Sequence, residues 1–179
     1  FAEATEGPAD KALFAFFEEV FERDVAASPL RAMQLGRKTR YDELDDVSEA
    51  RYQADLEQAK ADLARLKRDF PTGLSPNAAF YASLFRERTE DRIDDFRWRR
   101  HQYVLTLVSG PHTDLPVQLI NQHKVESRED ALAYISRLKQ FSRYFAQVQE
   151  RLDLADKAGI LPPRYFFPDL INVSRNQIK

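Results

Sequence analysis

Residues 48–73 read SEARYQADLEQAKADLARLKRDFPTG, and this stretch decides the fold class. Its apolar residues recur at spacings of 4, 3, 4, 3 and 4, at Tyr52, Leu56, Ala59, Leu63, Leu66 and Phe70. That spacing is typical of an α-helix with one face against a neighbour. Ser48 can cap the helix at its start, and Pro71 with Gly73 ends it. Since roughly two heptads are too few for a long coiled coil, we expect an antiparallel partner helix within the same domain.

Periodic apolar segments on both sides of this helix predict further helices. They cover residues 10–27, 30–35 and 77–100, a short helix capped by Thr113-Asp114, a long helix from Ser127 to Gly159, and a last segment from Arg164. The long helix carries apolar residues at spacings of 3, 3, 3, 4, 3, 4 and 3, from Leu132 to Ala155. Residues 101–108 have no evident partner strand, so we interpret them as a buried helix end or an extended connector. The sequence predicts an all-α fold, a multi-helix bundle-like array of about six or seven helices with no significant sheet.

Length and composition exclude several classes of protein. The 179 residues (20.8 kDa) predict a single helical domain over residues 1–179. A net charge of −2 does not favour nucleic acid or an anionic membrane as a partner. Zero cysteines exclude a disulfide scaffold, a thiolate zinc site and a cysteine nucleophile. No transmembrane segment is expected, because no apolar run approaches the ~20 residues that a membrane helix needs.

Histidines are the remaining candidates for metal ligands. His101, His112 and His123 are each 11 residues apart, but glycine and proline between them interrupt any helix that would align them. None lies in a His-Glu-x-x-His arrangement, the spacing that directs two imidazoles at one zinc. A nucleophile elbow and a glycine-rich phosphate loop are also missing from the sequence. We therefore predict no catalytic residue and no metal site within the chain, and histidines that cap loops or satisfy buried hydrogen bonds.

The densest basic patch is Arg97-Trp98-Arg99-Arg100-His101, with Tyr103 beside it. Cations and rings together can stack on a base or a carbohydrate, or clamp a carboxylate. Such runs more often pair with acidic residues of neighbouring helices, and Asp91, Asp94 and Asp95 lie nearby in the sequence. Arg100 and Tyr103 are therefore candidates for a substrate cleft, with a structural role as the alternative.

The stretch from Ser109 to Leu138 carries the most specific pattern. It contains Ser-Gly-Pro-His-Thr-Asp-Leu-Pro (109–116), then Asn121-Gln122-His123, Glu129-Asp130-Ala131, Tyr134 and Arg137-Leu138, and Gly159-Ile160-Leu161-Pro162-Pro163 follows. In this order, the elements resemble the N-terminal half of the bacterial domain-of-unknown-function 885 family. The residues that carry the resemblance are Gly110, Pro111, His112, Leu115, Pro116, His123, Tyr134, Arg137, Gly159 and Pro163. With the early Phe/Glu-rich helix and the Ser-Pro pairs, it spans nearly the whole chain.

This resemblance implies a zinc metallopeptidase-like protein, often an exported lipoprotein. The family's His/Glu zinc motif lies on a helix in the later half and has no counterpart here. No cofactor is therefore expected in this chain, while zinc is expected for a full-length protein of which this would be the N-terminal portion. Because the chain opens at Phe1 without an initiator Met, we expect either a processed product or a piece cut from a longer chain. The implied location is exported, periplasmic or associated with the cell envelope.

The resemblance also implies roles for single residues. Gly110 and Gly159 would shape turns, Pro116 and Pro163 would fix helix starts, Arg137 would pair with a carboxylate, and His112 and His123 would face a substrate cleft or cap loops. The function that follows is a non-catalytic wall of a peptide-binding cleft, whose partners are the C-terminal half of the same protein and a peptide substrate. The alternative is a helical binding or scaffold module for a peptide or protein, without hydrolytic activity.

Overall fold

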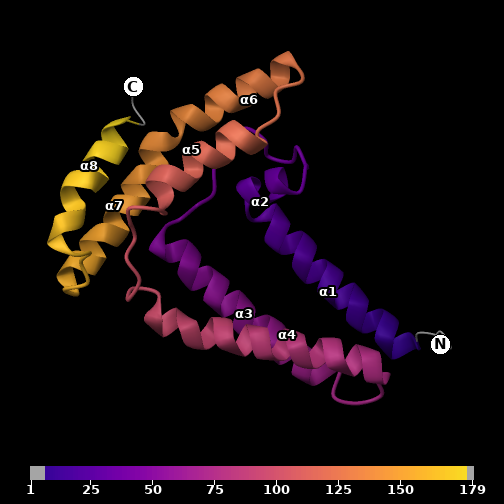
Figure 1. The fold of residues 1–179 in the computed structure, drawn as a ribbon. Helices are drawn as coiled ribbons and strands as arrows, with labels where there is room; N and C mark the ends of the chain where they lie inside the picture. The colour runs from indigo at the N-terminus through magenta and orange to yellow at the C-terminus, as the bar shows by residue number, and fades with distance from the viewer. Residues whose placement is uncertain (1–6, 177–179) are drawn as a thin grey trace. The chain divides into compact units, whose positions relative to one another are not determined.

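The computed structural model describes residues 7–176, and these form eight α-helices and two short 3₁₀ helices (Figure 1). In chain order they are α1 (Pro8–Ala26), α2 (Pro29–Gln34), α3 (Glu49–Asp69), α4 (Pro76–Asp95), η1 (Phe96–Trp98), α5 (Pro111–Gln122), α6 (Arg128–Lys139), α7 (Phe141–Lys157), η2 (Arg164–Phe166) and α8 (Phe167–Asn176). No strand occurs among the described residues, so the predicted all-α fold is confirmed. The predicted end of the last helix falls partly on residues 177–179, outside the described part of the chain.

The chain divides into two compact units that alternate along the sequence. Unit 1 holds α1 up to Val25 and Tyr52–Trp98, and unit 2 holds Ala26–Arg51 and the described residues from Arg99 onward. The single domain expected over residues 1–179 stays a prediction.

Unit 1 is built on α3. The apolar residues of α3 lie on its less exposed face, with Ala59 fully buried and Leu66 nearly so. As predicted, an antiparallel partner packs in the same unit, because the chain turns after Phe70 and returns as α4 (Figure 1). Phe16 of α1 joins them, with its ring centroid 5.9 Å from that of Phe70 and 5.5 Å from that of Phe85. An aromatic core therefore holds the three helices together.

Polar contacts fix the ends of the unit 1 helices. The Asp10 carboxylate accepts a hydrogen bond from the backbone N–H of Ser75 at 3.0 Å, and this bond lowers the pKa of Asp10. Ser75 in turn caps α4, with its hydroxyl accepting from the N–H of Ala78. Near the other end of α1, Arg23 donates to the buried carboxylate of Asp62 at 2.6 and 2.9 Å. The predicted Ser-Pro start of α4 is confirmed.

Unit 2 contains α2, α5, α6, α7 and α8 around a second core. Its buried apolar side chains are Leu30, Met33, Tyr41, Leu44, Leu115, Leu119, Tyr144 and Val148. Residues 101–110 are an extended connector without helix or strand, in agreement with one of the two interpretations of that segment. Gly159 ends α7 with a φ of 72°, and the N–H of Ile160 bonds to the carbonyl of Ala155 at 2.9 Å. This is the left-handed glycine end that the sequence predicts.

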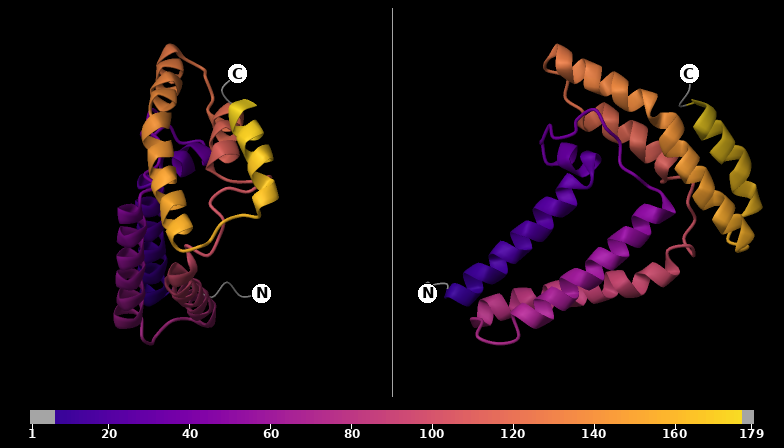
Figure 2. Two further views of the ribbon diagram at one scale, coloured as in Figure 1. Left: turned by 90° about the vertical axis from the view of Figure 1, so that its left-hand side faces the viewer. Right: turned by 180° about the vertical axis from the view of Figure 1, so that it is seen from behind.

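The single long helix predicted from Ser127 is wrong, because the structure divides it at Gln140 into α6 and α7, which follow one another almost end to end (Figure 2). Gln140 is both the C-cap residue of α6 and the N-cap residue of α7. Its side-chain amide bonds to the carbonyl of Asp42 at 2.7 Å and accepts from the N–H of Leu44 at 3.1 Å.

Candidate functional site

The start of α5 places His112 against the 101–110 connector. Gly110 is the N-cap residue, with a φ of 139°, and a Cβ at this position would lie 3.0 Å from the carbonyl oxygen of Val104 and 3.1 Å from Nδ1 of His112. Only glycine fits this close approach. The N–H of Gly110 donates to the Asp114 carboxylate at 3.1 Å, and the N–H of Asp114 donates to the Gly110 carbonyl at 2.9 Å. These reciprocal bonds fix the first turn of α5.

Two predictions about this helix are therefore wrong. The cap is Gly110 and not Thr113-Asp114, so α5 begins at Pro111. Pro116 consequently lies inside the helix instead of fixing its start. A proline there cannot donate to the carbonyl four residues earlier, which in α5 belongs to His112.

His112 is a buried imidazole without hydrogen-bond partners. The residue is 6% exposed, and neither Nδ1 nor Nε2 has a partner in the described part of the chain. Burial lowers the pKa of His112, and the nearby Asp114 carboxylate offsets only part of this effect. The ring is therefore held neutral near pH 7, with one N–H and one lone pair unused. An unsatisfied buried polar group of this kind calls for an explanation.

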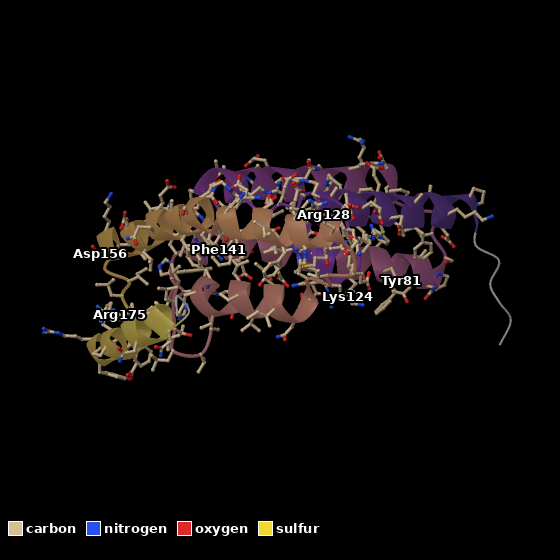
Figure 3. The ribbon with its side chains drawn as sticks, turned by 90° about the horizontal axis from the view of Figure 1, so that it is seen from above. Tyr81, Lys124, Arg128, Phe141, Asp156 and Arg175 are labelled. Atoms are coloured by element: carbon tan, nitrogen blue, oxygen red, sulfur yellow. The ribbon has the colours of Figure 1, made fainter. Side chains whose placement is uncertain are left out.

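A cavity of about 540 Å³ opens beside His112 within unit 2. It is lined by Leu105, His112, Pro116, Leu119, Ile120, Tyr134, Leu138, Phe141, Phe145, Val148, Gln149, Leu152 and Ser174. Phe141 marks the junction of α6 and α7 in Figure 3. Most of these side chains are apolar, and the volume lies in the range of roughly 300–1,000 Å³ found for ligand sites. An apolar cavity with a few polar groups is the expected form of a binding site.

A hydrogen-bond network around Arg137 lies next to this cavity. Arg137 has no exposed surface; it donates to the carbonyls of Glu43 at 2.9 Å and Pro29 at 3.3 Å, and to Nδ1 of His123 at 3.1 Å. Its Nη1 also lies 2.6 Å from Sδ of Met33. All of these acceptors are neutral, so the predicted carboxylate partner of Arg137 is wrong.

His123 is the second buried histidine, and its partners fix its protonation state. Nδ1 accepts from Arg137, while Nε2 lies 3.0 Å from the carbonyl oxygen of Asp130 and so must donate. Burial lowers the pKa of His123, and the neighbouring Arg137 cation adds to the effect. The ring stacks on Tyr41 at 4.1 Å between centroids and meets the edge of Tyr134 at 5.1 Å. For this histidine, the predicted role in satisfying buried hydrogen bonds is confirmed.

Asp130 anchors the same network at the start of α6. Ser127 and Asp130 form the capping box that the sequence predicts, with bonds of 3.0 and 3.1 Å. Lys38 donates to the Asp130 carboxylate at 2.8 Å, and this bond contributes most to lowering the pKa of Asp130 to about 2. The loop before α3 is thereby tied to α6.

The structure thus groups some of the predicted site residues and separates others. His112, Pro116 and Tyr134 line the cavity, Gly110 supports His112, and Leu115 is buried in the core beside them. Tyr134 also contacts His123, so it joins the cavity to the Arg137 network. Pro163 directly precedes η2, away from the cavity lining.

Arg100 and Tyr103 do not line the cavity. Arg99 and Arg100 both donate to the Glu49 carboxylate, the latter at 3.0 Å. Pairing with an acidic side chain supports the structural interpretation of the basic patch, although the acid is Glu49 and not Asp91, Asp94 or Asp95. Tyr103 is 45% exposed. The assignment of these two residues to a substrate cleft stays a prediction.

The cavity walls on α6 and α7 were not predicted as site residues. Leu138, Phe141 and Phe145 fit an apolar helix face, and nothing in that pattern distinguishes a cavity wall from a packed core. One signal could have found them: apolar residues follow one another at spacings of three, at Leu132, Ile135, Leu138 and Phe141. This spacing indicates that the apolar face shifts around the helix near Phe141.

Zinc is not accommodated by the described residues. No group of three or more His, Asp or Glu side chains among them is arranged to hold a metal ion. His112 and His123 are both buried, and Nε2 of His123 already pairs with the carbonyl oxygen of Asp130. No zinc chemistry is therefore assigned to these residues.

Replacing His112 with phenylalanine should stabilise unit 2. Phenylalanine keeps a planar ring and removes two buried polar atoms that have no partner. We expect the free energy of unfolding at pH 7.5 to rise by about 1–2 kcal/mol. Native-state hydrogen exchange of α5 and α6 amides measures this change. A loss of stability would mean that the imidazole has a partner or that Gly110 leaves too little room.

Comparison with known proteins shows the family of the chain. No curated protein and no solved structure matches the chain. Among the described residues, no helix is long and apolar enough to cross a membrane. The family model described as "Bacterial protein of unknown function (DUF885)" matches residues 29–179, which include all of α2 to α8 as far as they are described. The chain therefore belongs to the DUF885 family of bacterial proteins.

Proposed function

We propose that this helical region forms one wall of a peptide-binding cleft in a bacterial metallopeptidase-like protein. In this proposal the zinc motif lies on polypeptide outside residues 1–179, and the C-terminal half of the same protein supplies the opposite wall. The protein would be exported, as the family resemblance implies. The cavity beside His112 is the observation that carries the proposal.

The cavity suits one apolar portion of a peptide. Filling it would remove exposed apolar surface of Ile120, Leu138 and Phe145 from water, which contributes roughly 25 cal/mol per Å² buried. This effect favours the bound state and needs no catalytic group on this chain.

Two matched leucines of α6 provide a test. Leu138 lines the cavity and is 43% exposed, whereas Leu132 is 56% exposed and does not line it. We expect Leu138→Arg to weaken binding of a fluorescein-labelled pentapeptide, with phenylalanine and leucine between glycines, by at least about tenfold. Leu132→Arg should bind as the unchanged protein does. Fluorescence anisotropy measures both dissociation constants.

Equal binding by the two variants would place the peptide elsewhere and contradict the cleft wall. The same preparation, supplied with zinc, should show no hydrolysis of the peptide. Turnover that a chelator removes would contradict the non-catalytic role.

A second candidate is a scaffold that binds another protein without any hydrolytic role. Exposed apolar side chains on α5 and α6 favour it, namely Val117, Ile120, Leu132 and Ile135, which are 47–70% exposed. The variant pair separates the two functions. A protein partner held by this surface would be lost with Leu132→Arg, whereas a peptide in the cavity would not.

A further inference from the structure

We infer that unit 2 carries a second binding site, along η2 and α8, for an alkyl carboxylate, a small molecule with an apolar chain and one negatively charged end. The site is a hollow of about 860 Å³ whose walls include Leu161, Arg164, Phe167, Ile171, Asn172 and Arg175. It shares no lining residue with the cavity beside His112. The inference therefore goes beyond the proposed function and does not depend on it.

The spacing of residues in η2 and α8 places apolar and cationic side chains in one row. Phe167, Ile171 and Arg175 follow one another at intervals of four residues, so they lie on the same face of α8. Arg164 lies three residues before Phe167, in η2. Leu170 is buried and holds α8 to the unit by a different face. Along the row, two apolar residues thus stand between two cations.

The charges in the hollow favour an anion. Neither Arg164 nor Arg175 pairs with an acidic side chain among residues 7–176, and no acidic residue in this part of the chain lines the hollow. Other arginines of the protein are paired, as Arg40 is with Glu43 at 2.6 Å. A guanidinium binds a carboxylate through two parallel N–H···O bonds. The donors of the two unpaired arginines are available for such bonds.

An adjoining groove sets the direction in which the ligand lies. This groove shares Phe167 and Arg175 with the hollow, but Arg164 does not line it. Its lining includes the carboxylates of Asp153 and Asp156. Because like charges repel, the carboxylate of the ligand should lie toward Arg164, with the alkyl chain along Phe167.

The remaining walls suit an alkyl chain better than a peptide. Leu161, Phe167 and Ile171 are 39–47% exposed, and an alkyl chain laid over them would remove this apolar surface from water. Asn172 is the one neutral polar side chain among the described residues that line the hollow. The N–H and C=O groups of a peptide would lose water there and gain few partners, whereas an alkyl chain has no such groups.

The probe for this site is octanoate, titrated into the full 179-residue chain at pH 7.5 and followed by ¹H–¹⁵N chemical shifts. We expect the shifts to change in η2 and α8 and to stay fixed in α5 and α6. Octanamide lacks the charge and acetate lacks the chain, so both should bind at least about fivefold more weakly. Raising the salt concentration from 50 to 500 mM should weaken the binding of octanoate but not that of octanamide.

Three exposed arginines provide matched variants. Arg164→Gln should weaken octanoate about fivefold and Arg175→Gln about threefold, since each removes one exposed ion pair with the ligand. Arg128 on α6, labelled with Arg175 in Figure 3, is also exposed and does not line the hollow. Arg128→Gln removes the same charge and should bind octanoate as the unchanged protein does. Unchanged shifts of the α5 and α6 amides show that each variant is folded.

Three results would overturn the inference. Octanamide that binds as tightly as octanoate would remove the role of the charge, and equal binding by Arg164→Gln and Arg128→Gln would remove the role of the hollow. Tighter binding of N-acetyl-Gly-Leu, a peptide with an apolar side chain and a free carboxylate, would replace the alkyl carboxylate by a peptide end. Leu138→Arg should leave octanoate binding unchanged, so a failure of the cleft wall and a failure of this site are measured separately.

Discussion

Replacing Arg137 with alanine is expected to lower the free energy of unfolding of unit 2 by about 4 kcal/mol. The substitution leaves the carbonyls of Pro29 and Glu43 and Nδ1 of His123 without a donor in a buried site. Each such orphan costs about 1–3 kcal/mol, and the lost side-chain volume adds a cavity term. Amide hydrogen exchange in α6 measures the change within unit 2.

Arg137→Lys is the matched control for this prediction. Lysine keeps the charge but lacks the planar fork that serves three acceptors at once, so we expect about half of the loss. If the lysine variant is as stable as the unchanged protein, charge alone accounts for the role of Arg137. If the alanine variant is equally stable, the network does not hold the loop against α6.

The unusual feature of this arginine is that only neutral groups accept its hydrogen bonds, while the carboxylates of Asp42 and Asp45 act on it from a distance. Burial lowers the pKa of Arg137, but a guanidinium stays protonated in proteins. Its charge is stabilised by carbonyl dipoles, by the imidazole of His123 and by the Tyr41 ring, 4.9 Å from the guanidinium carbon. The cation therefore requires a neutral His123, and the two residues act as one unit.

Helix positions followed from the sequence because capping and apolar spacing are local signals. The Ser-Pro start of α4, the capping box of α6 and the glycine end of α7 are each determined within a few residues. The start of α5 was misjudged for the same reason. Thr113-Asp114 has the residue types of a cap, and only the close approach of Val104 and His112 shows that Gly110 fills that position.

The face that α6 buries could not be read from its apolar residues. Leu132, Ile135 and Leu138 are 43–56% exposed, whereas Asp130 and Arg137 are buried. The polar residues lie inside because Lys38 pairs with Asp130, and because the carbonyls of Pro29 and Glu43 need a donor. These partners are about 90 to 110 residues away along the chain, and no local periodicity carries that information. Because α6 turns Asp130 and Arg137 inward, Leu138 stays outside the core and forms part of the cavity wall.

Acidification below about pH 6.5 should destabilise unit 2 steeply. Burial lowers the pKa values of His112 and His123 below the ordinary value of 6.5 that each regains on unfolding. Below that pH the unfolded chain binds more protons than the folded one, so stability is complete above about pH 6.5 and falls as the pH drops toward the folded pKa values. Two such groups give a slope of at most about 2.7 kcal/mol per pH unit. Asp130, with a pKa of about 2, contributes only at lower pH, when the carboxylate begins to lose its bond from Lys38.

Variants of each histidine separate the two contributions between pH 5 and pH 8. His112→Phe removes one titrating group and should halve the slope while raising stability throughout. His123→Gln removes the other and keeps an acceptor for Arg137, so it should also halve the slope without the loss expected of Arg137→Ala. Below its folded pKa, a protonated His123 would place a second cation 3.1 Å from the donor atom of Arg137, and the start of α2 at Pro29 and the following loop with Glu43 should be released with it. The protection factor of the Leu44 amide should fall with acid while those of the α6 amides persist if only this loop detaches, whereas both should fall together if all of unit 2 unfolds. An unchanged slope in either variant would show that the corresponding histidine is not held neutral in the folded protein.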